Sequence, residues 1–138
     1  MFVFGRNSVG FHVMGGHRKI IAVVEDDASM LKGVDRLLSV HGFGTELYDS
    51  AEAYLGGAAA SGAACLVVDI HLGGMSGLDL SHRLTASGSK VPVIFMTAMD
   101  DEETRRTATR AGCIAYLRKP FPAHLLIDAI RRSAGPAA

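Results

Sequence analysis

Polar side chains follow four apolar runs of this sequence, at the point where each run ends. Glu25 and Asp26 come directly after one run, Asp69 ends another, Thr97 closes a third and Lys119 lies just after a fourth. Short apolar runs rich in β-branched residues are typical of buried parallel strands. Because the carboxyl ends of parallel strands share one edge of a sheet, where open α/β sheets bind ligands, we expect these side chains to gather in one crevice.

Their combined chemistry suits the transfer of a charged group. Three carboxylates in one crevice repel each other and favour a hard divalent cation with oxygen ligands, of which Mg²⁺ is the usual cellular choice. Lys119 adds a positive charge and Thr97 a hydroxyl donor. Phosphoryl transfer needs this combination, because it depends mainly on positioning and on neutralising the phosphoryl oxygens. Asp69, which ends the central run, is the nucleophile that the arrangement implies.

The apolar patterns that must position these residues alternate between strand and helix. This alternation predicts an α/β fold with a doubly wound parallel sheet and helices on both faces. We expect strands at 19–24, 42–48, 64–69, 91–96 and 113–117, and helices over 30–42, from 50 to 55, from 77 to the loop at 87, over 100–111 and from 122 onward.

The expected helix at 100–111 offers a core little apolar surface. Ala108, Ala111 and threonine methyl groups are its only candidates for packing. We therefore expect this helix to be weakly anchored.

Length and charge limit the classes of protein. The 138 residues suffice for one domain, with an irregular extension at 1–18 and a tail at 135–138. Lys and Arg number 14, as do Asp and Glu, so no global field attracts nucleic acid or an anionic membrane. We expect no signal peptide and no membrane span. Cys65 and Cys113 both fall in predicted buried strands, and we expect them to be reduced core residues of a cytoplasmic protein.

Six short motifs in order give the chain a resemblance to a known family. Over residues 19–134 it resembles the receiver domain of two-component response regulators. The matching segments are Val-Val-Glu-Asp-Asp at 23–27, Val-Val-Asp at 67–69, Gly-Met-Ser-Gly at 74–77, Phe-Met-Thr-Ala at 95–98, Tyr-Leu at 116–117 and Lys-Pro-Phe at 119–121. The spacing between these segments also fits the family. The resemblance implies a flavodoxin-like fold whose five strands are ordered 2-1-3-4-5.

The resemblance also implies roles for the acidic residues. Asp69 would accept a phosphoryl group from a phosphohistidine on a histidine kinase or a histidine phosphotransfer protein. Asp26 and Asp69 would bind Mg²⁺ directly, together with the backbone carbonyl of His71, and Glu25 would act through water. The protein would be a signalling domain and not an enzyme, apart from self-catalysed phosphoryl transfer and autodephosphorylation.

Other residues match the family's phosphoryl-binding and switch positions. Thr97, Ala98 and Lys119 would hold the phosphoryl oxygens, and the peptide bond before Pro120 would be cis, which needs a proline. Tyr116 occupies the aromatic switch position. From sequence alone, an ordinary half-buried strand aromatic is an equal interpretation of Tyr116.

The chain departs from the family pattern near the expected site. Gly73 stands where the family often has proline, so we expect a looser loop. His71 and Met99 lie two residues after Asp69 and Thr97, where side chains can gate the access of water to a phosphoryl group.

Two other functions are alternatives to phosphoacceptance in a signalling relay. A phosphatase or phosphotransferase with an Asp nucleophile usually needs a second carboxylate two residues later, where this chain has His71. A pseudo-receiver would bind proteins without being phosphorylated, and the retained Asp69, Thr97 and Lys119 argue against it.

The sequence shows no helical unit with the basic clustering of a DNA reader. We therefore expect no direct DNA binding, unless the chain is a fragment of a longer regulator. Output would pass to a protein target, or to a second copy, through the face formed by the helix at 100–111, the strand at 113–117 and the last helix.

Overall fold

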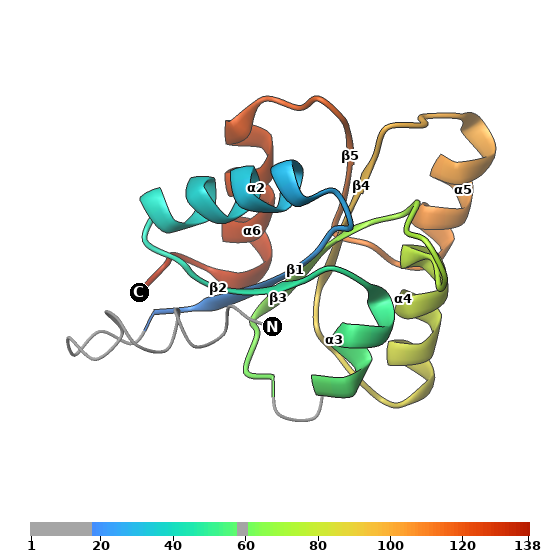
Figure 1. Ribbon diagram of the computed structural model, residues 1–138, viewed down its shortest axis with the longest axis horizontal. Coiled ribbons are helices and arrows are strands. Elements are labelled where there is room, and N and C mark those ends of the chain that lie inside the picture. Colours follow the sequence, from blue (N-terminus) through green and yellow to red (C-terminus); the bar gives the residue numbers. More distant parts are fainter. Residues whose placement is uncertain (1–17, 58–60) are drawn as a thin grey trace.

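The fold is a five-stranded parallel sheet between two layers of helices. The computed structural model describes residues 18–57 and 61–138 (Figure 1). The strands lie in the order β2-β1-β3-β4-β5, which confirms the predicted doubly wound sheet. In chain order the elements are β1 (Ile20–Val24), α2 (Ala28–Val40), β2 (Gly44–Tyr48), α3 (Ala51–Gly57), β3 (Cys65–Asp69), α4 (Gly77–Ala86), β4 (Val93–Thr97), α5 (Glu102–Arg110), β5 (Ala115–Arg118) and α6 (Ala123–Ala134).

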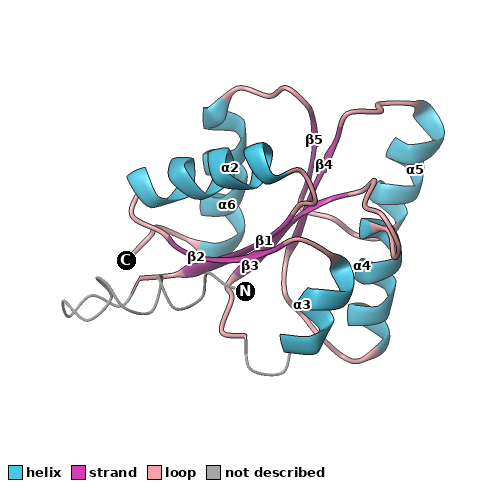
Figure 2. Ribbon diagram, in the orientation of Figure 1, coloured by secondary structure: helices cyan, strands magenta, loops and turns pink. Residues whose placement is uncertain are grey.

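Alternate residues of the inner strands enter two separate cores. In β1, Ile21 and Val23 pack with α2 and α6, whereas Ala22 and Val24 pack with α3, α4 and α5. Figure 2 shows these helices on the two faces of the sheet. Burial on both faces explains why the inner strands are apolar runs and do not alternate with polar residues.

Three strand predictions began two residues too early, and the first of them, at 42–48, is paired only over Gly44–Tyr48. The run predicted as a strand at 91–96 is paired only over Val93–Thr97, so Pro92 precedes β4. The run at 113–117 is paired over Ala115–Arg118, because its first residues complete the turn at Gly112, where φ is 80°. Cys113 was therefore wrongly placed in a buried strand and is only half-buried, whereas Cys65 lies fully buried in β3.

Helices α2, α4 and α5 begin at side-chain caps that the sequence supplies, whereas α6 begins at Pro122 without one. Asp27 accepts hydrogen bonds from the backbone N–H groups of Ser29 and Met30, at 2.9 and 3.1 Å, and so starts α2 directly beside the acidic residues. Ser76 and Asp101 cap α4 and α5 in the same way. Each cap satisfies N–H groups that have no partner within the helix, a contribution of about 1 kcal/mol.

The predicted N-terminal extension and C-terminal tail can be compared with the ends of the described chain. The irregular extension predicted at 1–18 lies outside the described residues, except for Arg18. The tail predicted at 135–138 is in contact with the start of β1, since the Lys19 N–H donates a hydrogen bond to the Ala137 carbonyl at 2.8 Å. Within the described ranges, no helix has the length and apolar character needed to cross a membrane.

The start of α4 is pressed against the end of β3. A Cβ atom on Gly77 would lie 2.4 Å from the Asp69 carbonyl oxygen and 3.0 Å from the Ile70 Cα. The Gly77 N–H donates to the Ile70 carbonyl at 2.9 Å. Only glycine allows this approach, which fixes the backbone that carries Asp69.

We expect Gly77→Ala to lower the free energy of unfolding by about 1–3 kcal/mol, because the added methyl group must displace backbone. Gly33→Ala is the matched control: nothing lies within 4 Å of its Cβ position in α2. This control should gain about 0.5–1 kcal/mol from helix propensity. Urea denaturation of both variants measures the difference, and equal stabilities would show that the close approach at Gly77 is unimportant.

We also expect the backbone amides of α5 to exchange hydrogen faster than those of α2 and α6. Ala108 is the only buried residue of α5, whereas four residues of α6 are buried. Local opening costs less free energy where fewer apolar contacts are lost. Hydrogen exchange followed by NMR measures this, and equal protection in the three helices would contradict the weak anchoring.

Candidate functional site

Three carboxylates converge where β1 and β3 end. Glu25 and Asp26 follow β1 directly, and Asp69 is the last residue of β3. One oxygen atom of each carboxylate lies within 4.8 Å of the other two. Glu25 and Asp69 are buried and Asp26 is exposed. An all-oxygen donor set that is open on one side fits a hard divalent cation such as Mg²⁺.

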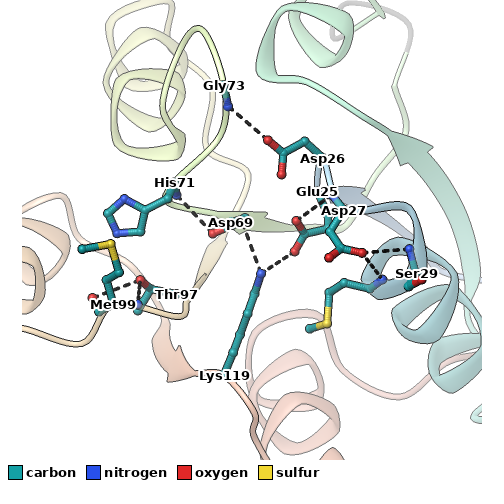
Figure 3. Close-up of polar contacts among 11 residues, drawn as sticks. Glu25, Asp26, Asp27, Ser29, Asp69, His71, Gly73, Thr97, Met99 and Lys119 are labelled. Atoms are coloured by element: carbon teal, nitrogen blue, oxygen red, sulfur yellow. Dashed lines mark hydrogen bonds and ion pairs between the residues drawn. The ribbon is translucent and has the colours of Figure 1, made fainter.

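Lys119 bridges two of these carboxylates from the end of β5. Its Nζ donates hydrogen bonds to Glu25 Oε1 at 2.6 Å and to Asp69 Oδ2 at 3.2 Å (Figure 3). The Lys119 backbone N–H is bonded to the Thr97 carbonyl at 2.7 Å, and the Lys119–Pro120 peptide bond is cis, as the resemblance implied. The side chain therefore crosses the crevice as a fixed bridge and does not extend into solvent.

Burial and hydrogen bonding shift the pKa values of Glu25 and Lys119 in opposite directions. Burial raises the pKa of Glu25 above its usual value, and the hydrogen bond from Lys119 offsets only part of that rise. Burial by itself would lower the pKa of Lys119, but the hydrogen bond to Glu25 and the negative charge of Asp69 leave it raised. Pairing therefore favours the charged form of Lys119, whereas burial favours the protonated form of Glu25.

The loop after β3 is held by two carboxylates. Asp26 Oδ2 accepts a hydrogen bond from the Gly73 N–H at 3.1 Å, and Figure 3 shows Asp26 turned toward that loop. Glu52 Oε2, in the first turn of α3, accepts one from the Met75 N–H at 2.9 Å, which lowers the pKa of Glu52. A proline at position 73 could not donate to Asp26. The looseness expected from Gly73 is thus offset by a hydrogen bond that only a non-proline residue can make.

The Thr97 hydroxyl is engaged within its own loop. Thr97 Oγ1 accepts a hydrogen bond from the Met99 N–H at 3.0 Å and donates one to the Met99 carbonyl at 3.1 Å. Ala98 lies exposed between them. His71 is exposed, and its backbone N–H donates to Asp69 Oδ1 at 3.1 Å. The structure therefore brings Lys119 and the acids into direct contact and directs the Thr97 hydroxyl to Met99.

Tyr116 lies on β5, paired in register with Phe95 of β4. Its side chain is half-buried, and its hydroxyl donates to Asp100 Oδ1 at 3.3 Å. Burial raises the pKa of this hydroxyl, and the nearby Asp100 carboxylate adds to the rise. The ring is thus attached to the segment that leads into α5.

Three acidic residues of this region were missed in the sequence. Asp27 is a helix cap. Its position just before a periodic helix pattern is the signal that could have indicated this role. Glu52 supports the loop after β3, and Asp100 accepts from Tyr116. No local signal marks the last two, because their partners lie far away in the sequence.

Comparison with known proteins identifies the family. A family model described as the response regulator receiver domain matches residues 21–131. The chain belongs to this family. The receiver domain is 35% identical over 121 residues to the transcriptional regulatory protein FixJ of Bradyrhizobium diazoefficiens, covering 86% of this chain and 59% of that one. It is 30% identical over 122 residues to the response regulator protein TodT of Pseudomonas putida, covering 88% and 54%.

Solved structures agree with this identification. A response regulator receiver protein from Burkholderia phymatum is 38% identical and superposes with a TM-score of 0.76, covering 88% of this chain and 98% of that one. The curated relatives are longer: this receiver domain spans only 54% of TodT and 59% of FixJ. The comparisons thus establish a receiver domain of two-component signalling.

We expect Lys119→Met to lower the free energy of unfolding by about 3 kcal/mol, because it leaves Glu25 and Asp69 as uncompensated, largely buried charges. The loss should shrink as the pH falls toward the raised pKa of Glu25, since protonation removes one of those charges. Adding Glu25→Gln to the variant should recover part of the loss. Denaturant titrations at several pH values test this, and a loss that is independent of both pH and Glu25 would contradict the electrostatic explanation.

Proposed function

We propose that this receiver domain takes a phosphoryl group onto Asp69 from the phosphohistidine of a histidine kinase or a histidine phosphotransfer protein, and that the modification changes a protein-interaction surface. The observation that carries the proposal is the position of the Asp69 carboxylate. It ends the central strand 3.2 Å from Lys119 Nζ, within a group of three carboxylates. A nucleophile, a cation and a divalent-metal donor set thus share one crevice.

The chemical step follows from these positions. A carboxylate oxygen of Asp69 forms a bond to phosphorus while the bond from phosphorus to the histidine nitrogen breaks, and the electron pair of that bond returns to the imidazole. Asp26, Asp69 and the His71 backbone carbonyl would bind Mg²⁺ directly, with Glu25 acting through water. When bound, Mg²⁺ neutralises charge on the phosphoryl oxygens.

The chain's own donors complete the phosphoryl site. Lys119 needs only to exchange its contacts with the carboxylates for a phosphoryl oxygen, because its Nζ already lies against Asp69. The Thr97 hydroxyl and the backbone at Ala98 hold the remaining oxygens. To do so, the Thr97 hydroxyl must give up the hydrogen bond that it donates to the Met99 carbonyl.

This exchange at Thr97 is the origin of the proposed switch. Movement of the hydroxyl toward Asp69 opens space behind β4, into which the Tyr116 ring can turn. Both arrangements are available to the unmodified protein, and the phosphoryl group shifts their populations through its better contacts in one of them.

The switch acts on the face formed by α5, β5 and α6. We propose that a protein target or a second copy of the chain reads this face, in the cytoplasm and without direct DNA binding by the receiver domain. The single buried residue of α5 supports the proposal, because a weakly anchored helix moves at low cost.

Phosphorylation and Mg²⁺ binding are tested together. Wild-type protein with acetyl phosphate and Mg²⁺ should gain the mass of one phosphoryl group, and Asp69→Asn should gain none. Asp26→Ala should lose both Mg²⁺ binding, measured by calorimetry, and phosphorylation, because it removes a direct oxygen ligand. Asp27→Ala is the control: it should keep both and lose about 1 kcal/mol of stability with its helix cap.

Three results would contradict parts of this assignment. Unchanged phosphorylation of Asp26→Ala would remove Asp26 from the metal site. Phosphorylation of Asp69→Asn would move the acceptor elsewhere. A wild type that gains no mass would favour the pseudo-receiver function.

The switch makes a separate prediction. Beryllium fluoride, a phosphoryl mimic, with Mg²⁺ should change NMR shifts along residues 97–130 more than along residues 30–60. Thr97→Ala should reduce this response while Asp69 still accepts phosphate, since the variant lacks the hydroxyl that couples Asp69 to Tyr116. A wild-type response confined to the immediate site would leave the phosphoacceptor proposal standing and refute the switch.

A further inference from the structure

Asp100, Arg105 and Tyr116 form a cluster between the end of β4 and the first turns of α5. Arg105 Nη2 lies 2.6 Å from both carboxylate oxygens of Asp100, and the Tyr116 hydroxyl donates to Asp100 Oδ1 at 3.3 Å. The Arg105 guanidinium also lies 5.7 Å from the centre of the Tyr116 ring, within the range of a cation–π contact. Each of the three side chains thus contacts the other two.

Burial makes Asp100 the centre of this cluster. Its side chain is 13% exposed, whereas that of Arg105 is 58% exposed. A carboxylate that has lost most of its water depends on the donors that replace it, and hydrogen bonds to an ionised group are stronger than neutral ones. Tyr116 is one of the two side chains that donate to Asp100 here, so the ring is held against α5.

In the loop before α5, the residue that holds Tyr116 is not the residue that caps the helix. Asp101 caps α5 by accepting from the Thr104 N–H at 2.8 Å. At the other end of the loop, Thr97 is bonded to Met99. The loop therefore connects the hydroxyl that must move toward a phosphoryl group with the carboxylate that holds Tyr116.

We propose that Asp100 and Arg105 form a latch that holds the Tyr116 ring against the start of α5 and so sets how much of the receiver domain occupies the switched state before phosphorylation. The inference rests on the proposed function, in which Tyr116 turns inward. Only two residues separate Thr97 from Asp100, so the movement of Thr97 toward Asp69 draws Asp100 away from Tyr116 and opens the latch.

The latch has an energetic consequence at Asp69. Contacts made only in the resting state lower the population of the switched state, and they lower the apparent affinity for any ligand that binds the switched state better. Asp100 and Arg105 are thus positioning residues for the switch, and they act without touching the phosphoryl group.

The first test uses the unmodified protein and needs no phosphoryl group. Nuclear Overhauser contacts of the Tyr116 ring should reach Arg105 in the wild type. In Asp100→Ala they should extend to the Thr97 methyl group, as the ring samples the inward position. Ring contacts that are identical in the two proteins would overturn the latch.

The second test measures the bias on the switch. Asp100→Ala and Arg105→Ala should each raise the apparent affinity for beryllium fluoride with Mg²⁺ by about three- to tenfold, the range for a partly exposed ion pair with a charge-assisted hydrogen bond. Arg106→Ala is the matched control. Arg106 is 54% exposed on the same helix and is paired with Glu102 at 3.1 Å. It should leave the affinity unchanged.

A double-mutant cycle separates the latch from general loosening of α5. Tyr116→Phe keeps the ring and removes the hydroxyl that Asp100 accepts from, so the gain from Asp100→Ala should shrink in that background. An undiminished gain, or equal effects of Arg105→Ala and Arg106→Ala, would overturn the proposal. If Asp100→Ala does not fold, Asp100→Asn replaces it, with the same direction and a smaller gain.

These outcomes distinguish the latch from the proposed function. A wild type that neither binds beryllium fluoride nor takes phosphate onto Asp69 would refute the phosphoacceptor function. The ring contacts of Tyr116 in the unmodified protein would still decide whether Asp100 and Arg105 hold it.

Discussion

The ammonium group of Lys119, held between Glu25 and Asp69, is the contact on which the site depends. A parallel sheet that delivers carboxylates to one edge creates repulsion that burial makes worse, and a cation must offset it. Lys119 is brought there by β5, the edge strand opposite β2, so the neutralising charge depends on the pairing of β5 with the rest of the sheet.

The α/β class and the membership of the acidic group were predictable because they follow from local patterns, whereas the strand order was implied by the family resemblance. Buried parallel strands are apolar throughout and end on the polar residues of the crevice, so the run before Asp69 and the runs before Glu25 and Thr97 indicated both strand and site. The register of the sheet then determined that these ends meet. The strand errors were largest at the first residues of β2, β4 and β5, where each strand begins two residues later than predicted.

Contacts between distant segments were not predictable where the residues lie away from the strand ends. Glu52 reaches Met75 and Asp100 reaches Tyr116 only because the packed helices bring them together, and neither pair has a spacing that a helix or strand period would mark. The hydrogen bond from the Gly73 N–H to Asp26 was not predictable either, although it attaches to an acidic residue of the site the loop that was expected to be loose. Each of these links joins two segments whose own sequences carry no signal of the contact.

The single buried methyl group of Ala108 has a further consequence for α5. Because packing constrains one position of that helix, selection can change its outward residues with little penalty to the fold. Duplicated receiver genes could therefore diverge on α5 first and acquire different partners while keeping the crevice unchanged. In that sense the helix with the fewest buried residues is also the one on which new signalling specificity can evolve most freely.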